Sequence, residues 1–357
     1  MKINSNSTAV IQTACAIVFC LFTFCYTYYY QADVLMVDQH VLSGGQTKYY
    51  PLTAAILITV VLQLLQLLVR AFFRLYKSGH ALTYLPSLLV LAVITSGGKD
   101  IDKHFSFGPW WWIVPILLVF FVFAAIVVRQ IQEVEMPIKG PLLVSRCMWV
   151  NMLTLFVMFF LVGVAGNSDK VFHERMKMER LLLENNPEEA LEVGKKSYDT
   201  DSCLTLLRVH ALAKTNQLGE RLFEYPIVGG AAAMTPNGNS VRTLMYPAKD
   251  ILVQKKKSAV DYQLCEHLLN KDLKAFASLL VRTYPLNKPL PKHYREALYL
   301  YGVVTPYAQY KLHDNVIAAD YADFKKLQRQ TPDKDARQAV VRDVYGKTYW
   351  YYFFYKE

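Results

Sequence analysis

Two short stretches of the sequence combine carboxylates with imidazoles, and there residue type and spacing could do chemistry. Asp100, Asp102 and His104 alternate within residues 97–108, so an extended backbone would point their side chains to one side. Such a triplet could bind a metal ion or act as a general base toward a hydroxyl group. The alternative is that these residues are the solvated charges of an ordinary loop.

The second stretch follows the first apolar run and contains Asp33, Asp38 and His40. If the apolar runs cross a membrane in turn, both stretches lie on the same side of it. The six residues are then the candidate catalytic residues of a membrane enzyme that acts on a lipid-linked sugar or an envelope lipid at the outer interface. We assign no cofactor and no resident metal ion, and a role without catalysis is favoured.

The elements that would position these residues are five apolar runs, each without Asp, Glu, Lys or Arg. About 20 apolar residues in a helix cross a hydrocarbon core of about 30 Å, so each run predicts a transmembrane helix. The runs are residues 8–30, 51–69, 81–97, 109–128 and 147–166. The sequence therefore predicts an all-α protein with a five-helix transmembrane domain over residues 1–166 and a soluble domain over residues 167–357.

The polar side chains at depth in these runs are amides rather than charges. Gln63 and Gln66 lie in the second run and Asn151 in the fifth, and amides at that depth usually make interhelical hydrogen bonds. The absence of carboxylates and histidine from the runs argues against an ion-coupled or proton-coupled transporter.

Basic residues in the connections predict the orientation, because cytoplasmic loops carry the excess of lysine and arginine. The side of the N-terminus has seven, namely Lys2, Arg70, Arg74, Lys77, Arg129, Lys139 and Arg146. The other side has three, Lys48, Lys99 and Lys103. We therefore expect a multi-pass protein of a bacterial inner membrane with a cytoplasmic N-terminus and a periplasmic C-terminal domain.

The net charge of +10 could indicate a nucleic-acid partner, but the expected compartment and the lack of a basic motif interleaved with aromatic residues argue against one. A positive face beside anionic headgroups explains the charge, so we expect membrane lipids as partners.

The predicted soluble domain has two cysteines, Cys203 and Cys265. A disulfide between them and two buried thiols are both open.

Short helical segments joined by polar turns recur in the predicted soluble domain. Residues 188–198 and 203–214 form one pair, and similar segments begin near Leu218, Leu269 and Pro291. These pairs resemble tetratricopeptide repeats, whose period is about 34 residues. The resemblance implies degenerate antiparallel helical hairpins, and a helical bundle without repeat geometry is the alternative.

Two segments of this domain depart from the helical pattern. Residues 227–258 are rich in glycine and proline, which predicts a segment without a regular helix that is either a recognition loop or a packed strap. The aromatic run at 349–355 is too long for one helix to bury completely. We expect it to cap the helical core and to touch the bilayer or a partner.

The segment Gln39–Gly45 reads QHVLSGG and follows the tyrosine-rich end of the first run. With this segment, residues 1–70 resemble an uncharacterised family of bacterial polytopic inner-membrane proteins that have helical-repeat C-terminal regions. The resemblance implies a multi-pass anchor with a helical C-terminal domain, and it implies no activity.

Stacked helical hairpins offer a concave surface that commonly binds peptides or protein segments. The sequence therefore predicts a membrane-anchored scaffold or assembly factor with a protein partner on its soluble domain. An accessory subunit of a transport complex is a further alternative, beside the membrane enzyme.

Overall fold

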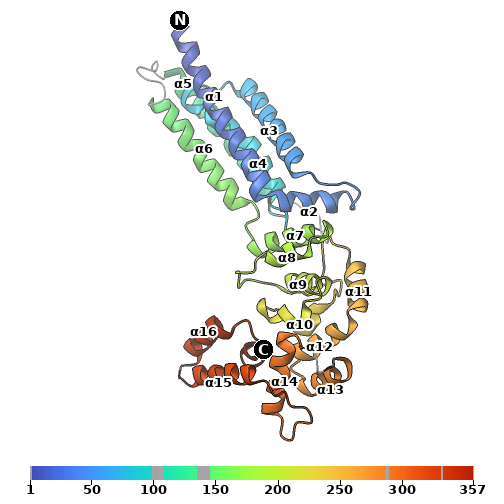
Figure 1. Cartoon of the computed structure of the whole chain (residues 1–357). Helices are drawn as coiled ribbons and strands as arrows, with labels where there is room; N and C mark the ends of the chain where they lie inside the picture. The colour runs from blue at the N-terminus through green and yellow to red at the C-terminus, as the bar shows by residue number, and fades with distance from the viewer. Residues whose placement is uncertain are drawn as a thin grey trace. The chain divides into compact units, whose positions relative to one another are not determined.

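The computed structural model describes residues 2–98, 101, 108–134, 145–285, 289–330 and 333–356. The chain divides into two compact units, Met1–His173 and Glu174–Glu357. Within the described ranges every regular element is a helix and none is a strand, so the predicted all-α class is confirmed (Figure 1).

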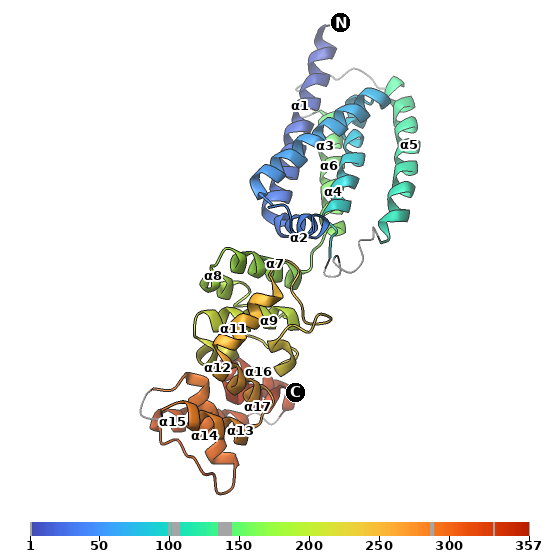
Figure 2. The ribbon, with the colours of Figure 1, turned by 90° about the vertical axis from the view of Figure 1, so that its right-hand side faces the viewer.

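The first unit contains a bundle of apolar helices and the helix α2, which lies across the end of the bundle (Figures 1 and 2). The elements are α1 (Lys2–Cys25), the π-helical turn η1 (Tyr26–Tyr30), α2 (Ala32–Leu42), α3 (Pro51–Phe73), the 3-10 helix η2 (Lys77–Tyr84), α4 (Leu85–Ile94), α5 (Trp110–Val134) and α6 (Arg146–Ala165).

Four of these helices are long and apolar enough to cross a membrane, which corrects the predicted number of five. They cover Thr8–Tyr30, Pro51–Phe73, Trp110–Ile131 and Arg146–Ala165, close to four of the predicted runs. The remaining run, predicted at 81–97, forms a shorter apolar segment at Ser78–Ile94 whose first half is the 3-10 helix η2.

Pro86 explains where this shorter segment changes its geometry. Proline is best tolerated in the first turn of an α-helix, and α4 begins at Leu85 with Pro86 in that turn. A 3-10 helix rises about 2.0 Å per residue and an α-helix about 1.5 Å, so the eight residues of η2 and the ten of α4 together extend about 31 Å. The mixed segment is therefore as long as a hydrocarbon core is thick.

Amides stabilise the bundle from within, as predicted. Gln66 Nε2 donates to Thr83 Oγ1 at 2.8 Å, and Asn151 Oδ1 accepts the backbone N–H of Ala81 at 2.7 Å. Gln63 donates to Gln66 and accepts from Cys20 Sγ of α1. Because Thr83 and Ala81 lie in η2, these bonds satisfy polar groups of the 3-10 helix inside an apolar bundle.

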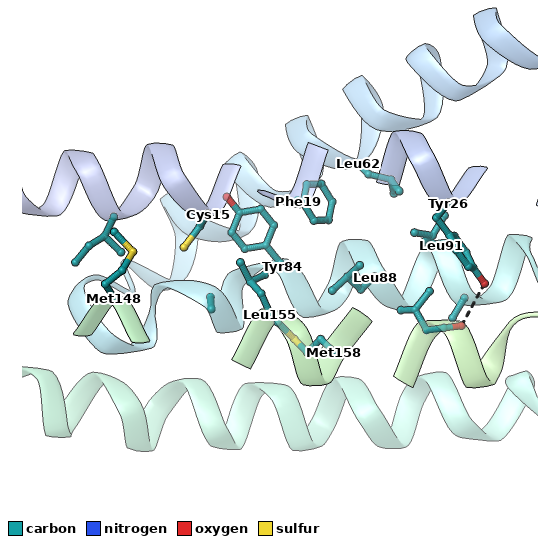
Figure 3. Packing of buried hydrophobic residues seen from close by; sticks show 14 residues of the cluster. Cys15, Phe19, Tyr26, Leu62, Tyr84, Leu88, Leu91, Met148, Leu155 and Met158 are labelled. Carbon is teal, nitrogen blue, oxygen red and sulfur yellow. Dashed lines mark hydrogen bonds between the residues drawn. The ribbon is translucent and has the colours of Figure 1, made fainter. Parts of the chain in front are cut away.

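The apolar core of the first unit joins α1, α3, α4 and α6. Figure 3 shows Phe19 of α1 and Tyr84 of η2 side by side, with ring centroids 4.7 Å apart. Leu88 of α4 and Leu155 of α6 belong to the same cluster of buried side chains. By contrast, α5 packs through Phe121 and Ala125 and leaves most of its other large apolar side chains exposed.

Polar contacts join three helices at the end of α6. Asn167 donates its backbone N–H to the Thr95 carbonyl at 2.7 Å and its side-chain amide to the Gly97 carbonyl at 2.6 Å. Its own carbonyl accepts from Gln31 Nε2 at 2.9 Å. The residues after α1, α4 and α6 are therefore held together.

The second unit consists of short helices, and many consecutive helices pack against each other, among them α8 with α9 and α12 with α13. The elements are α7 (Lys170–Leu183), which begins in the first unit, α8 (Pro187–Glu192), α9 (Ser202–Lys214), α10 (Leu218–Arg221), η4 (Leu222–Glu224), η5 (Gly230–Met234), α11 (Ala248–Lys257), α12 (Ala259–Leu269), α13 (Leu273–Thr283), α14 (Lys292–Val304), α15 (Asn315–Gln330), α16 (Lys334–Tyr345) and α17 (Tyr349–Tyr355).

The segment 227–258 contains helices, which corrects the prediction that it has no regular helix. It includes η5 and α11. Between them, the backbone N–H groups of Leu244, Met245 and Tyr246 donate to the buried carboxylate of Glu179 at 2.6–3.1 Å. Buried irregular backbone needs such partners, and this part of the segment is therefore a packed strap.

Candidate functional site

The structure describes three of the six candidate catalytic residues. Asp33, Asp38 and His40 lie on α2, whereas Asp100, Asp102 and His104 lie outside the described residues. No group of three metal-binding side chains occurs within the described ranges.

A cavity of about 1090 Å³ lies beside α2 in the first unit, and we call it the α2 pocket. Its described lining is mainly apolar and includes Leu57 and Ile58 of α3, Val93 and Ile94 of α4 and Trp110 of α5. The polar side chains that line it are Asp38, Gln39, Ser43, Tyr49 and Ser96. No described lining residue is basic.

Asp38 is the candidate catalytic residue that the fold brings to this pocket. Its Oδ1 atom is buried and has no hydrogen-bond partner among the described residues. Burial raises the pKa of the carboxyl to about 7, because the charged form loses its hydration. Near neutral pH the carboxyl can therefore accept or give up a proton.

Gly97 lies directly against Asp38. A Cβ atom at position 97 would lie 2.3 Å from Asp38 Oδ1, which is far too close for a side chain there. The absence of a side chain at Gly97 thus makes room for the carboxyl. This contact joins α2 to the residues that follow α4.

Tyr49 was not predicted as a site residue, yet its hydroxyl is the second unpartnered polar group at the pocket. The hydroxyl is buried and makes no hydrogen bond to a described residue. Burial raises the pKa of Tyr49 to about 12, and the negative charges of Asp33 and Asp38 add to the effect. The surroundings of Tyr49 therefore carry a negative potential.

Asp33 and His40 do not line the α2 pocket. The ring of His40 lies against Gly45, where a Cβ atom would be 3.2 Å from His40 Cε1. Asp33 influences the pocket through its charge on Tyr49. Of the three candidate residues on α2, only Asp38 therefore lines the pocket, since side chains two or five positions apart on a helix point to different sides.

A second cavity, of about 570 Å³, lies within the second unit, and we call it the basic groove. Its walls come from the α8–α9 connection, from the residues around η4 and from α16 and α17. The lining includes the basic residues Lys195, Lys196, Arg342, Lys347 and Lys356, and the acidic residues Glu224 and Asp343. Cations therefore outnumber carboxylates along the groove.

Aromatic rings interleave with these cations. The Arg342 guanidinium lies 4.9 Å from the ring centroid of Tyr198, which is 70% exposed. Tyr225, Tyr351 and Tyr352 also line the groove. The side chains of Lys196 and Lys347 form no ion pair with a described residue, so both are available to an anionic ligand.

The aromatic helix α17 forms one wall of the groove and is anchored in the core. Tyr349, Trp350, Tyr351 and Tyr352 are buried. Trp350 Nε1 donates to the Glu296 backbone carbonyl at 3.0 Å, and the Tyr349 N–H donates to the Glu296 carboxylate at 2.7 Å. The expected capping of the helical core by this run is confirmed for these four residues.

The two cysteines of the second unit are free thiols. Cys203 Sγ donates to the Ser240 carbonyl at 3.3 Å, and Cys265 Sγ lies 3.7 Å from Tyr294 Oη. Both are buried in separate contacts, which corresponds to the thiol alternative.

A model of a family of unknown function, DUF6057, matches residues 249–356. The match covers the helices from α11 to α17, and it does not include the QHVLSGG segment. No curated protein matches the chain. No solved structure matches it either.

Proposed function

We propose that the protein is a membrane-anchored scaffold or assembly factor whose helical second unit binds a segment of a partner protein. The basic groove carries this proposal. It is assembled from residues near 195, 225 and 345, and it combines exposed cations with tyrosine rings. Such a surface suits an extended protein segment that presents carboxylates.

The chemistry of the groove favours binding over catalysis. Its carboxylates, Glu224 and Asp343, are accompanied by arginine, since Arg221 Nε lies 3.1 Å from Glu224 and Arg342 Nε lies 3.9 Å from Asp343. Degenerate tetratricopeptide-like hairpins would present such a groove in the way that helical repeats present peptide-binding surfaces.

The proposed location follows from the charges between the apolar segments. The excess of lysine and arginine on the side of Lys2 favours a cytoplasmic N-terminus, in a bacterial inner membrane. The mixed segment η2–α4 must then cross as well, and its length of about 31 Å is sufficient. Under this proposal the second unit lies in the periplasm, and a periplasm-active reporter fused after Glu357 should be active.

Site-specific crosslinking in cells tests the binding proposal. A photoreactive residue in place of Tyr198 should crosslink to a reproducible protein partner, whereas the same residue at Val316, which is exposed on α15 outside the groove, should not. Reversing charge with Lys196→Glu and Lys347→Glu should abolish the Tyr198 crosslink. Lys326→Glu, an exposed charge on α15, should leave it intact.

Two results of this experiment would contradict the proposal. If position 198 gives no reproducible protein crosslink while the protein is present at its normal level, the groove is not a protein-binding site. A crosslink that survives the charge reversals would place the partner elsewhere on the second unit.

A further inference from the structure

The α2 pocket combines three features that the scaffold proposal does not use. It is a large cavity with a mainly apolar lining, it contains a buried acceptor without a partner in Asp38 Oδ1, and it contains a buried hydroxyl without a described partner in Tyr49. Unpartnered buried polar groups are costly, so each one in a native protein needs an explanation, such as a functional role or a bound species that supplies the missing partner.

The position of the pocket indicates an amphiphile rather than a small polar molecule. Its walls include the first turns of α3, the last turn of α4 and the first turn of α5. In helices that cross a bilayer, such end turns lie near the headgroup level. A hydrocarbon chain could pack against Leu57, Ile58 and Ile94, while its head group faces α2.

The charges of the residues at the pocket indicate which lipid head group it binds. Asp38 lines the pocket and Asp33 adds negative potential at Tyr49, whereas no described lining residue is basic. Lys48, which precedes Tyr49 in the sequence, lies 5.8 Å from the ring centroid of Tyr50 and is not among the described residues that line the pocket. A head group with N–H donors and a positive charge therefore complements the site.

We propose that the α2 pocket binds an aminophospholipid, with its primary ammonium group donating to the carboxylate of Asp38 and an acyl chain along the apolar wall. Phosphatidylethanolamine has this chemistry. Phosphatidylcholine has the same charges but no N–H donor, so it is a matched control ligand.

Native mass spectrometry of the purified full-length protein tests the proposal. The probes are phosphatidylethanolamine, phosphatidylcholine and diacylglycerol with identical acyl chains, each added from mixed micelles. We expect the wild type to prefer phosphatidylethanolamine over phosphatidylcholine by about tenfold, the worth of one charge-assisted hydrogen bond. Diacylglycerol, with a hydroxyl head, should bind no better than phosphatidylcholine.

Two variants assign the preference to Asp38. Asp38→Asn keeps the size of the side chain and removes its charge, so it should abolish the preference for phosphatidylethanolamine. His40→Gln, on the same helix but outside the pocket lining, should retain it. Thermal unfolding of both variants checks that the bundle is intact, and Leu57→Trp, which fills the apolar wall, should weaken the binding of all three lipids.

Three results would overturn the proposal. Equal binding of phosphatidylethanolamine and phosphatidylcholine to the wild type would exclude a site that recognises the N–H donors of the head group. A preference that persists in Asp38→Asn would place the site elsewhere, and diacylglycerol binding as tight as that of phosphatidylethanolamine would identify a hydroxyl site. None of these results bears on the basic groove, which belongs to the other unit.

Discussion

The two units differ in whether they bury charged side chains. In the first unit the buried polar side chains that stabilise the bundle, such as Gln66, Thr83 and Asn151, are uncharged. In the second unit, charged Arg175 and Glu179 are buried and paired at 3.3 Å. We attribute this difference to the surroundings, which are apolar for the first unit and aqueous for the second.

The exposed surfaces show the same contrast. On α5, Val119 is 71% exposed and Phe123 65% exposed, so apolar residues face outward as well as inward. An apolar solvent gives no hydrophobic advantage to burial, and such bundles depend on close packing and neutral hydrogen bonds. The second unit buries its apolar residues away from water and can include charges in its interior only when they are paired, as Arg175 is, or hydrogen-bonded, as Arg208 is.

Removal of Glu179 should have the largest effect on the second unit. Glu179→Ala leaves Arg175 buried without its partner and the N–H groups of the 244–246 strap without an acceptor, which should cost about 3–5 kcal/mol. Hydrogen exchange should show the loss of protection at residues 244–246. Glu184→Ala, at a half-exposed glutamate directly after the same helix, serves as the control, and equal effects of the two substitutions would contradict the role of the strap contact.

Acid should destabilise the second unit through His210. Burial lowers the pKa of this histidine to about 4, with Lys214 adding to the shift and Asp250 opposing it. Because the unfolded state has a pKa near 6.5 and binds the proton more tightly, stability is complete above about pH 6.5 and falls by about 3 kcal/mol as the pH decreases to 4.

The substitution His210→Gln checks this pH dependence. Glutamine can still bond to Tyr246 Oη, which lies 2.9 Å from His210 Nε2, but it does not titrate. Thermal unfolding between pH 7.5 and 4.5 should therefore depend less on pH in the variant. An unchanged pH profile would show that another group is responsible.

Loss of an amide inside the first unit should have a smaller effect. Asn151→Leu removes the acceptor for the Ala81 N–H, which should cost about 1–2 kcal/mol. Unfolding of the protein in mixed micelles measures this change. Thr154→Val on the same helix is the control, because the Thr154 hydroxyl donates only to the carbonyl of Val150 one turn earlier in its own helix. A larger loss of stability in the control than in Asn151→Leu would argue against a structural role for Asn151.

Removal of an N-cap side chain should have the smallest effect on stability in either unit. Asp272 Oδ1 accepts the Ala275 N–H at 2.9 Å in the second unit, and Ser145 Oγ accepts the Met148 N–H at 3.3 Å in the first. Asp272→Ala should cost about 1 kcal/mol and Ser145→Ala less, since the serine bond is longer and uncharged. Denaturation midpoints would detect the reverse order, which would contradict this ranking.

The long apolar helices could be predicted from the sequence because a membrane-spanning helix requires only an apolar, charge-free stretch of sufficient length. The run predicted at 147–166 forms α6 at Arg146–Ala165, since a charge-free stretch of that length has one stable form in a bilayer. The mixed geometry before Pro86 was not predictable. It depends on Asn151, which lies far along the chain and supplies a partner for the freed backbone of Ala81.

The candidate sites could be predicted only in part. Asp38 was among the candidates, but the sequence could not separate it from Asp33 and His40, because the contact of Asp38 with Gly97 depends on packing between α2 and the end of α4. The basic groove had no sequence signal. Its residues, among them Tyr198 and Arg342, are distant in the chain and meet only when the helices of the second unit stack.

The hydrogen bonds of Asn167 also have a mechanical consequence. Its backbone and side chain connect it to Thr95, Gly97 and Gln31, which follow two other helices. A pulling force that reaches residue 167 from the downstream chain is therefore divided among three helices instead of drawing α6 alone along its axis. Extraction of the anchor under tension should then proceed as the removal of a whole bundle.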